Sequence, residues 1–434
     1  MKKVLVIGCA RSGYWVSRLL NEHGYDVTVT DQKAIPEKAE LEKMGITVIE
    51  HGHPDYLLAI DWDFAVKNPG ISYKVPFVAA LVEKNIRIYT EIEIALPYAE
   101  HFRYGAVTGT NGKTTTTTLL ALILEAERTA YASGNIGTPL SETVYHHGQE
   151  TADIAIEISA FQLVGAPSFH PLVSAIVNLT PDHLDYFASL DDYYQAKTLV
   201  YRNQRDDDWF LRNTDDLNVL KYCRDIPCKI IDFSLDHDAD LMLKKGWVTL
   251  FDTELFAVSD LKIVGRHNIQ NAMIAAAMAY RLGINPSTIR RVISEFRGIE
   301  HRIEFVQEIG SVKYFNDSKG TNVDSTVTAL KAFDQPVILI AGGYDKHTGF
   351  KDMENYRDKI KKLLVYGATK KELAQLKADA IICEDLQEAT QKAYELALPN
   401  DIVLFSPACA SYDQFNNYEE RGRLFKDIVR HLGL

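Results

Sequence analysis

The sequence predicts an α/β protein of three domains. Short apolar runs that read as strands alternate with stretches of helical periodicity over most of the chain, as in doubly wound folds. The alternation is interrupted by a polar segment after Pro97 and restarts near Gly298, and 434 residues are too many for one hydrophobic core. We therefore expect a Rossmann-like domain at 1–97, a central P-loop domain with flanking antiparallel strands at 98–298, and a Rossmann-like domain at 299–434.

Charge and cysteine content narrow the class of protein. Lys and Arg total 47 against 59 Asp and Glu, a net charge of −12, which argues against a general nucleic-acid or anionic-membrane binder. No apolar run approaches the length of a membrane span, about 18 residues or more. The apolar run of the N-terminal MKKVLVIGCA stops at Arg11 and reads as a first strand instead of a signal peptide. The cysteines form no CxxC pair, which indicates a reduced, cytoplasmic protein without a structural zinc: Cys9, Cys223, Cys228, Cys383 and Cys409.

The first domain opens with a strand at 4–7, the turn GCARSG and a helix that continues to Leu20. A second strand, at 26–30, ends in Asp31, as in dinucleotide-binding units. Ala10 stands at the central glycine of the fingerprint, where its methyl group impedes close approach of a pyrophosphate. An NAD site therefore stays an alternative, and a sheet that holds another nucleotide fits better. Further strands are expected at 46–49, 64–66 and 86–89, and a helix at 75–84.

The central domain is organised around GTNGKTTTTT, residues 109–118, between a strand at 104–108 and a helix at 119–126. A glycine turn at a helix start offers backbone N–H groups and the positive end of the helix dipole to a triphosphate. Lys113 can reach terminal oxygens and the Thr114 hydroxyl can ligate Mg²⁺. The spacing differs from the general P-loop, because Val107 and not glycine stands five positions before Gly112. The alternative is a β–α turn with a chance GKT.

The remaining elements follow the same reasoning. Strands are expected at 153–158 and 172–179, antiparallel strands between 206 and 263, and helices at 267–282 and 286–295. In the third domain strands are expected at 312–315, 337–340, 363–365, 380–382 and 402–405.

Polar residues at strand ends are the candidates for chemistry in the central domain. Glu157, in DIAIEIS, is either an acid on a solvated strand face or a Walker-B-like ligand of Mg²⁺ beside the P-loop strand. NLTPDHLDYF places Asp182, His183 and Asp185 in one loop, as solvated side chains or as metal ligands. In YYQAK, Lys197 shares a helix face with Tyr193, and by pattern alone it is a surface lysine.

Two further clusters flank the second domain junction. Asn268 and Asn271 stand in the first turn of an apolar helix, where one can cap the helix and the other can contact a base. Arg302 opens the third domain, and Asp317, Lys319 and Thr321 follow its first predicted strand. Since AGGYDKHTGF and SPACASYDQF also follow strands, three loops are expected to converge at the carboxyl edge of the third sheet.

The motifs TGTNGKTT, EISAFQL, NLTPDHLDY, YYQAK, HNIQN, EHR and NDSKGTN, in this order, resemble the Mur ligases, the ATP-dependent amino-acid-adding enzymes of peptidoglycan precursor synthesis. GCARSG, KNPGI and SPACASYDQFNNYEERG resemble the members that add D-glutamate. The resemblance implies UDP-binding, ATPase and amino-acid-binding domains, and a ligase that joins UDP-N-acetylmuramoyl-L-alanine and D-glutamate with ATP through an acyl phosphate. It also implies a cytoplasmic enzyme with two Mg²⁺ sites; we expect a monomer.

The same resemblance implies roles for individual residues. Lys113, His183 and Lys197 would be catalytic, with Lys197 carbamylated, and Thr114, Glu157, His183 and Lys197 would hold metal. The nucleotide would be bound by Gly109, Thr110, Asn111, Gly112, Lys113, Thr114, Thr115, Asn268, Asn271, Arg302 and Asp317. The substrates would be bound by Ser12, Gln32, Asn68, Asn135, Lys319, Thr321, Lys346, Ser411 and Tyr412. Asn68 replaces the usual serine of an SPG turn, and Gly320 replaces an alanine.

Two other functions stay open at this point. One is a related ligase that adds a different amino acid. The other is a nucleotide-dependent switch without ligase chemistry, which would not need the basic and hydroxyl side chains of the third domain.

Overall fold

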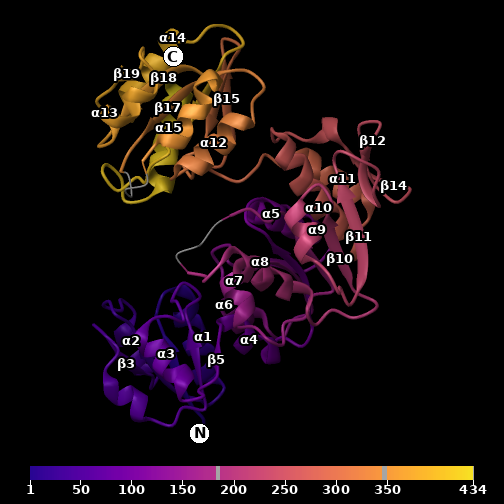
Figure 1. Ribbon diagram of the computed structural model, residues 1–434, viewed down its shortest axis with the longest axis vertical. Helices are drawn as coiled ribbons and strands as arrows, with labels where there is room; N and C mark the ends of the chain where they lie inside the picture. Colours follow the sequence, from indigo (N-terminus) through magenta and orange to yellow (C-terminus); the bar gives the residue numbers. More distant parts are fainter. Residues whose placement is uncertain (182–185, 345–348, 434) are drawn as a thin grey trace. The chain divides into compact units, whose positions relative to one another are not determined.

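The chain contains three β-sheets in the computed structural model, which describes residues 1–181, 186–344 and 349–433 (Figure 1). Contacts divide the chain into two units. The first contains Met1–Val258 and Gln270–Ile293 and holds two of the sheets; the second contains Ser259–Ile269 and Ser294–Leu434 and holds the third. The α/β prediction with three sheets is confirmed, and the domain limits 1–97, 98–298 and 299–434 stay a prediction.

The first sheet is parallel, with the order β3-β2-β1-β4-β5. Alternate residues of β1 enter different cores: Val4 and Val6 pack on one face, Leu5 and Ile7 on the other. Helices α1 and α2 cover the first face and α3 the second, which gives the doubly wound arrangement expected from the sequence. The strands are β1 (Lys3–Ile7), β2 (Asp26–Thr30), β3 (Thr47–Ile49), β4 (Phe64–Lys67) and β5 (Ile88–Tyr89), and the helices are α1 (Arg11–Glu22), α2 (Lys38–Lys43), η1 (Asp55–Ala59), α3 (Pro76–Glu83), α4 (Glu91–Ala95) and η2 (Leu96–Tyr98).

The first sheet is joined to the second by buried contacts. Leu19 of α1 and Ile92 of α4 belong to the same apolar cluster as the inner strands of the second sheet. Arg11 also forms an ion pair with Glu142, with 2.7 Å between Nε and Oε2. The two sheets of this unit therefore share a core, which fixes the loops of one against those of the other.

The second sheet has the order β14-β13-β12-β11-β10-β9-β6-β8-β7. The predicted antiparallel strands are confirmed for β12, β13 and β14. For β10 and β11 the prediction is wrong, because both continue the parallel sheet from β9. The strands are β6 (Phe102–Thr108), β7 (Ala130–Gly134), β8 (Ala152–Glu157), β9 (Val173–Ile176), β10 (Trp209–Asn213), β11 (Lys229–Ser234), β12 (Leu241–Lys244), β13 (Trp247–Leu250) and β14 (Thr253–Ala257).

Helix α5 starts earlier than the sequence predicts, at Lys113 instead of Leu119. Its threonines enter the helix because most of them are buried: Thr116 and Thr117 have no exposed surface. Packing thus outweighs the poor helix propensity of β-branched residues. The helices here are α5 (Lys113–Glu125), α6 (Leu140–His147), α7 (Ala160–Val164), α8 (Leu190–Thr198), η3 (Leu199–Tyr201), α9 (Leu217–Tyr222), η4 (Val258–Asp260), α10 (Arg266–Arg281) and α11 (Pro286–Glu295).

The third sheet has the order β15-β16-β20-β17-β18-β19, and only β15 runs antiparallel to its neighbour. Alternate residues of β17 again enter two cores, Leu339 and Ala341 on one face and Ile338 and Ile340 on the other. The elements are β15 (Glu304–Ile309), β16 (Val312–Asn316), α12 (Val323–Lys331), β17 (Val337–Gly342), η5 (Lys351–Lys359), β18 (Ile360–Tyr366), α13 (Lys370–Leu373), η6 (Ala374–Leu376), β19 (Ile381–Ile382), α14 (Leu386–Leu396), β20 (Ile402–Phe405) and α15 (Tyr418–His431).

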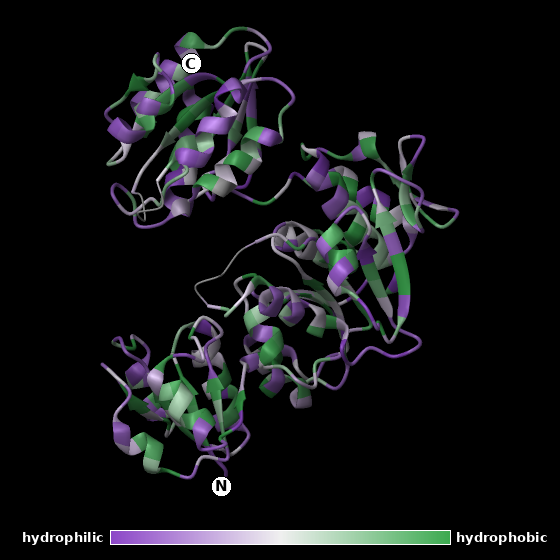
Figure 2. Cartoon of the chain, in the orientation of Figure 1, coloured by the Kyte–Doolittle hydropathy of each residue, from purple (hydrophilic) through white to green (hydrophobic). Residues whose placement is uncertain are grey.

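Hydrophobic residues concentrate along the strands, and the helices carry mixed faces (Figure 2). None of the described helices is long and apolar enough to cross a membrane. All five cysteines are free thiols, and Cys9, Cys223, Cys383 and Cys409 are buried.

Candidate active site

The phosphate-binding loop predicted at 109–115 connects β6 to α5. Gly109 and Gly112 have φ angles of 143° and 83°, which residues with a side chain rarely adopt. Space is restricted as well, because a Cβ atom at Gly112 would lie 2.4 Å from Oδ1 of Asn271. Both glycines are therefore required, and the loop delivers the N-terminus of a thirteen-residue helix to the carboxyl edge of the sheet.

The loop is held from the end of the neighbouring strand β9, a support that the sequence reasoning missed. Asn178 accepts the N–H of Asn111 through Oδ1 at 2.8 Å and donates to the Asn111 carbonyl at 3.1 Å. The Thr110 hydroxyl donates to the Thr180 carbonyl at 3.0 Å and accepts the Thr180 N–H at 3.0 Å. The signal in the sequence that could have indicated this support is the NLT of the NLTPDH motif, residues 178–180. Lys113 points back along the loop, and its Nζ donates to the Thr110 carbonyl at 2.9 Å.

Glu157 ends β8, directly beside β6 in the sheet. It is 2% exposed, so the interpretation as an acid on a solvated face is wrong. Asn135, after β7, donates from Nδ2 to Oε1 of Glu157 at 2.8 Å. Oε2 of Glu157 is buried and accepts no hydrogen bond from the residues that the structure describes.

A divalent cation fits this arrangement. A buried carboxylate oxygen without a donor is costly unless a cation faces it, and oxygen is the ligand that Mg²⁺ prefers. Thr114, the predicted hydroxyl ligand, lies at the start of α5 and is half-buried. Among the described residues no group of three or more His, Cys, Asp or Glu side chains is arranged to hold a metal, and His183 lies outside the described residues.

Lys197 lies near the end of α8 and is only 2% exposed, so the surface position expected from the helical pattern is wrong. Its Nζ donates to the carbonyl oxygen of Gly109 at 2.8 Å and lies 4.6 Å from the ring centre of Tyr193. The Tyr193 hydroxyl in turn donates to Oγ1 of Thr110 at 3.4 Å. The shared helix face of the two residues, which the sequence predicted, thus points at the phosphate-binding loop.

The two asparagines of α10 serve different partners. Oδ1 of Asn271 accepts a hydrogen bond from the Thr116 hydroxyl at 3.4 Å, beside Gly112. Asn268 donates from Nδ2 to the carbonyl oxygen of Val264 at 2.7 Å. Asn271 therefore belongs to the surroundings of the phosphate-binding loop, and its contact with the nucleotide stays a prediction.

In the first sheet, Ser12 and Asn68 are brought together at the ends of neighbouring strands. Nδ2 of Asn68 donates to the Ser12 hydroxyl at 3.3 Å, and Oδ1 accepts the N–H of Gly70 at 3.1 Å. Asp31 accepts the N–H of Cys9 at 2.7 Å and the N–H of Lys33 at 2.8 Å. Its carboxylate thus stabilises its own turns, which weakens the NAD alternative.

Gln32 is exposed and lines an open pocket of about 580 Å³ together with residues that the sequence reasoning did not single out. His53 stacks on Phe77 in this pocket, with 4.9 Å between the ring centres. The other lining residues are His51, Gly52, Asp55, Leu58, Val75 and Pro76. An aromatic wall beside polar groups suits a planar heterocycle.

In the second unit, Asp317 follows β16 and is 3% exposed. Its Oδ2 accepts from the Ser406 hydroxyl at 2.6 Å and its Oδ1 from the Ile303 N–H at 3.2 Å. Burial raises the pKa of Asp317 to about 7, even though these hydrogen bonds favour the ionised form. A Cβ at Gly320 would lie 2.6 Å from Oδ2, so the glycine that departs from the family motif leaves room for this carboxyl group.

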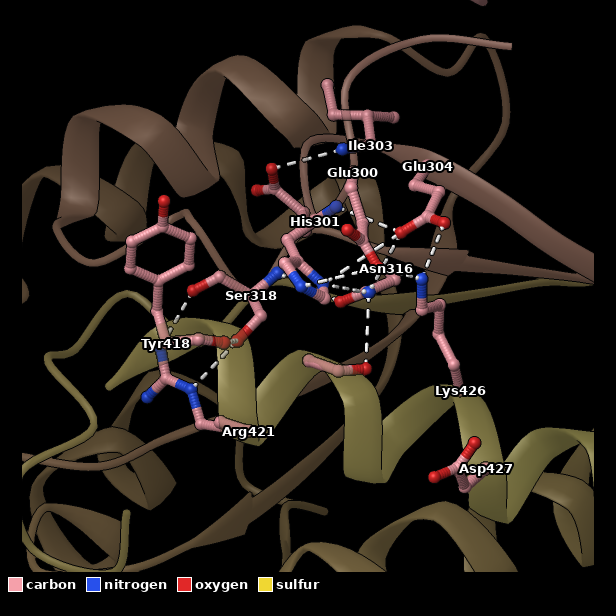
Figure 3. Close-up of polar contacts among 12 residues, drawn as sticks. Glu300, His301, Ile303, Glu304, Asn316, Ser318, Tyr418, Arg421, Lys426 and Asp427 are labelled. Carbon is pink, nitrogen blue, oxygen red and sulfur yellow. Dashed lines mark hydrogen bonds and ion pairs between the residues drawn. The ribbon is translucent and has the colours of Figure 1, made fainter. Parts of the chain in front are cut away.

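The segment that carries Arg302 is anchored on α15 by a polar cluster (Figure 3). Nδ2 of Asn316 donates to Nδ1 of His301 at 2.9 Å and to Glu304 at 3.1 Å, and Lys426 of α15 donates to Glu300 at 2.6 Å and Glu304 at 3.0 Å. Since Nδ1 accepts, His301 is neutral with its proton on Nε2, in agreement with a pKa lowered by burial. The sequence reasoning did not identify this anchor.

The same figure shows Arg421, also on α15, which is fully buried. It donates from Nη2 to the Ser318 carbonyl at 2.8 Å and from Nε to the Ser318 hydroxyl at 3.1 Å. Helix α15 therefore supports the loop after β16 through Arg421 and the segment around Arg302 through Lys426.

Of the residues predicted to bind D-glutamate, Lys319 and Thr321 follow β16 and Ser411 and Tyr412 follow β20, two strands that are adjacent in the sheet. Ser411 is buried, Tyr412 is 68% exposed, and Arg302, Lys319 and Thr321 are half-buried. The loops after β17 and β20 are paired through Tyr344 and Ala410. Lys346 lies outside the described residues.

Comparisons with known proteins agree with this arrangement. The family model described as the Mur ligase middle domain matches residues 107–279, and that described as the Mur ligase glutamate ligase domain matches residues 301–409. A UDP-N-acetylmuramoylalanine–D-glutamate ligase from Lactobacillus acidophilus is 40% identical, with 99% of this chain and 97% of that protein covered. One of the same description from Geobacillus sp. (strain WCH70) is 38% identical, with 99% and 98% covered.

Solved structures show the same fold at low identity. A UDP-N-acetylmuramate-alanine ligase from Thermotoga maritima has a TM-score of 0.60 at 19% identity, with 99% of both chains covered. A pseudomurein peptide ligase type C from Methanothermus fervidus has a TM-score of 0.58 at 18% identity, again with 99% of both chains covered.

Proposed function

This chain belongs to the Mur ligase family, and we propose that it joins D-glutamate to UDP-N-acetylmuramoyl-L-alanine, with conversion of ATP to ADP and phosphate, in peptidoglycan precursor synthesis. The observation that carries the proposal is the 40% identity to a D-glutamate ligase over nearly the full length of both chains. The assembly of the phosphate-binding loop, Glu157 and Lys197 at one sheet edge supports ligase chemistry over a passive nucleotide switch.

The phosphates of ATP would be held by the loop from Gly109 to Thr115. Backbone N–H groups at the start of α5 and the Lys113 ammonium neutralise phosphate charge. Thr114 and Glu157 would hold Mg²⁺, with Asn135 fixing the orientation of the Glu157 carboxylate. The ion, when bound, supplies a Lewis acid that offsets the charge of the transferring phosphoryl group.

We propose that Lys197 is carbamylated and serves a second Mg²⁺ together with His183. The position supports this role, because its Nζ already reaches the backbone of the phosphate-binding loop. A carbamate would convert a buried cation into an anionic oxygen donor at that position, which matches the ligand preference of Mg²⁺.

Each of the remaining predicted residues is assigned to one ligand. We propose that Ser12, Gln32, Asn68 and Asn135 bind the UDP-linked substrate, that Asn268, Asn271, Arg302 and Asp317 bind the nucleotide, and that Lys319, Thr321, Lys346, Ser411 and Tyr412 bind the carboxylates of D-glutamate. Buried or half-buried hydroxyl and lysine groups at a strand edge suit carboxylate recognition.

The reaction follows from the weakness of a carboxylate as an acyl donor. A carboxylate oxygen of the muramoyl-alanine substrate attacks the γ-phosphorus, and the bond to ADP breaks, which gives an acyl phosphate. The D-glutamate amine then attacks the acyl carbon, phosphate leaves and the amine loses a proton, so that an amide forms. The protein contributes in-line positioning and charge neutralisation.

One assay tests the function: ADP release by the wild-type chain with ATP, Mg²⁺, UDP-N-acetylmuramoyl-L-alanine and each candidate amino acid in turn. We expect release that depends on D-glutamate and exceeds the rate with L-lysine or diaminopimelate. Equal rates with and without D-glutamate would favour the nucleotide switch, and a preference for another amino acid would favour a different ligase of the family. We also propose a cytoplasmic, monomeric enzyme, because its UDP-linked substrate and ATP are soluble metabolites of that compartment.

A further inference from the structure

Lys67, the last residue of β4, carries a buried ammonium group. It is 1% exposed, and among the residues that the structure describes no carboxylate forms an ion pair with it. Instead, Nζ donates to the carbonyl oxygens of Ile71 at 2.7 Å, Asn68 at 3.3 Å and Pro69 at 3.4 Å. The ammonium therefore gathers three carbonyls of the KNPGI turn around one charge.

This charge is not required for packing. Burying an ammonium without an anionic partner is unfavourable, and burial lowers the pKa of Lys67 to about 8. An unbranched apolar side chain of similar length would fill the same space without desolvating a charge. The Lys67 ammonium is therefore better explained by its contacts with the carbonyl oxygens of the KNPGI turn than by core packing.

The turn that Lys67 holds contains a proposed contact of the UDP-linked substrate. The side chain of Asn68 makes two contacts: Nδ2 donates to the Ser12 hydroxyl, and Oδ1 accepts the N–H of Gly70. Because the Asn68 backbone carbonyl is a ligand of the Lys67 ammonium, the position of this amide depends on Lys67.

The fourth polar partner of Lys67 is Tyr186, which lies between β9 of the second sheet and α8. Nζ lies 3.1 Å from the hydroxyl of Tyr186, so that its three N–H bonds are shared among four oxygen acceptors, and this hydroxyl donates to the Ile71 carbonyl at 3.2 Å. The ammonium also lies 4.7 Å from the ring centre of Tyr73. Lys67 therefore joins the KNPGI turn to Tyr186, the second-to-last residue of the NLTPDHLDYF motif.

Tyr186 is the first ring of an aromatic row that leads to the phosphate-binding loop. The row consists of Tyr186, Phe161, Phe187 and Tyr193, with successive ring centres 4.2, 5.4 and 5.4 Å apart. Tyr193 ends the row with its hydroxyl on Thr110 and its ring against the Lys197 ammonium. Packed aromatic side chains and hydrogen bonds thus connect Lys67 to the phosphate-binding loop without interruption.

We propose that Lys67 is a positioning residue that couples binding of the UDP-linked substrate at the KNPGI turn to the phosphate-binding loop, through Tyr186 and the aromatic row. The inference rests on the proposed function for the identity of the two ligands. Lys67 touches neither reacting group; it orders the turn, and the turn and the loop then favour each other's ligand-bound conformation.

The test uses Lys67→Met, Tyr186→Phe and the double variant, with Lys74→Met as the matched control. Lys74 lies in the same loop and is exposed, so it reports the effect of removing a lysine charge alone. Two experiments are made: KM and kcat for UDP-N-acetylmuramoyl-L-alanine are measured in ADP release, and the Kd of a non-hydrolysable ATP analogue is measured by calorimetry with and without that substrate. Thermal unfolding reports the fold of each variant.

We expect Lys67→Met to raise KM roughly tenfold, the effect of losing hydrogen bonds from a charged group, while kcat changes much less. The factor by which the UDP-linked substrate tightens binding of the ATP analogue should fall towards one in Lys67→Met and in Tyr186→Phe, and the two substitutions should not be additive. Lys74→Met should resemble the wild type.

The outcomes separate the inference from the proposed function. A wild-type chain that releases no ADP with the UDP-linked substrate contradicts the function. An active wild type with unchanged KM and unchanged coupling in Lys67→Met contradicts the inference, as does full additivity of the two substitutions. If Lys67→Met unfolds, Tyr186→Phe alone decides, because it removes one hydroxyl and keeps the ring; unchanged coupling in that variant contradicts the inference.

Discussion

The Nζ atom of Lys197 donates a hydrogen bond to the carbonyl oxygen of Gly109, which lies 88 positions earlier in the chain, at 2.8 Å. The contact joins the end of α8 to the first residue of the phosphate-binding loop. Since both residues are buried, the contact excludes water from one side of the loop. A change of side-chain charge at Lys197 is therefore expected to affect phosphoryl transfer.

Lys197→Ala should abolish ADP release, because the proposed carbamate and the support of the loop are lost together. Small carboxylates such as formate or acetate should restore part of the activity by taking the place of the carbamate. ADP release is measured with and without the added carboxylate, with Lys221→Ala, an exposed lysine of α9, as the control. Full activity of Lys197→Ala would contradict the carbamate role.

Glu157→Gln should lower ADP release by more than roughly a hundredfold, since even outer partners of metal ligands affect metal sites 10- to 100-fold. The glutamine keeps an oxygen for Asn135 and replaces the other carboxylate oxygen by an amide nitrogen that cannot ligate Mg²⁺. The rate is measured against Mg²⁺ concentration, with the exposed Glu83→Gln as control. An unchanged Mg²⁺ requirement would exclude Glu157 as a ligand.

Asp317 should make stability depend on pH in a direction opposite to that of an ordinary aspartate. Its pKa in the folded state is about 7, raised by burial from 3.8, so the folded chain binds more protons than the unfolded chain between those values. The free energy of unfolding should therefore fall as pH rises from about 4 to about 7, by at most about 1.4 kcal/mol per pH unit.

Urea unfolding across this range, compared between the wild type and Asp317→Asn, measures the slope. The asparagine variant should lack this contribution, since its side chain stays neutral. Asp358→Asn, at an exposed position, should keep the wild-type slope. The same slope in all three proteins would show that Asp317 titrates normally.

Gly422→Ala should destabilise the second unit by roughly 1–3 kcal/mol, the usual effect of overpacking, in spite of the gain of about 1 kcal/mol expected for alanine in a helix. The added Cβ would lie 2.2 Å from Nδ1 of His301, inside the polar cluster of Figure 3. Thermal unfolding measures this loss of stability. In a protein that already carries His301→Ala, the imidazole is absent and Gly422→Ala should no longer destabilise the unit. A Gly422→Ala protein as stable as the wild type would mean that His301 moves freely.

The strands were largely predictable because their signal is local. Runs such as those of β1 and β17 are nearly continuous apolar segments followed by glycine, as expected for strands buried on both faces. Strand direction is not local: β10 and β11 were expected to be antiparallel, but the period of two along a strand does not reveal which way its neighbour runs. Strand β7, AYASG, was missed because it has no β-branched residue.

The candidate site was predictable where the backbone conformation requires a particular residue type in a motif. Gly109 and Gly112 were identified from their pattern, and their positive φ angles explain it. The burial of Lys197 was not predictable from spacing, because an i, i+4 pair with a tyrosine looks the same on a surface helix. Lys67 and Asn178 were missed for a related reason: what defines them is a partner more than sixty residues away.

The buried cysteines have a practical consequence for labelling. Burial raises the pKa of Cys9, Cys223 and Cys228 to about 12 and that of Cys383 to about 11, so these thiols stay protonated at neutral pH and react slowly with alkylating reagents. A single cysteine introduced at an exposed position such as Lys74 would therefore be modified first in the otherwise native chain. A fluorophore attached there would follow the KNPGI turn while substrates bind, without removal of the native cysteines.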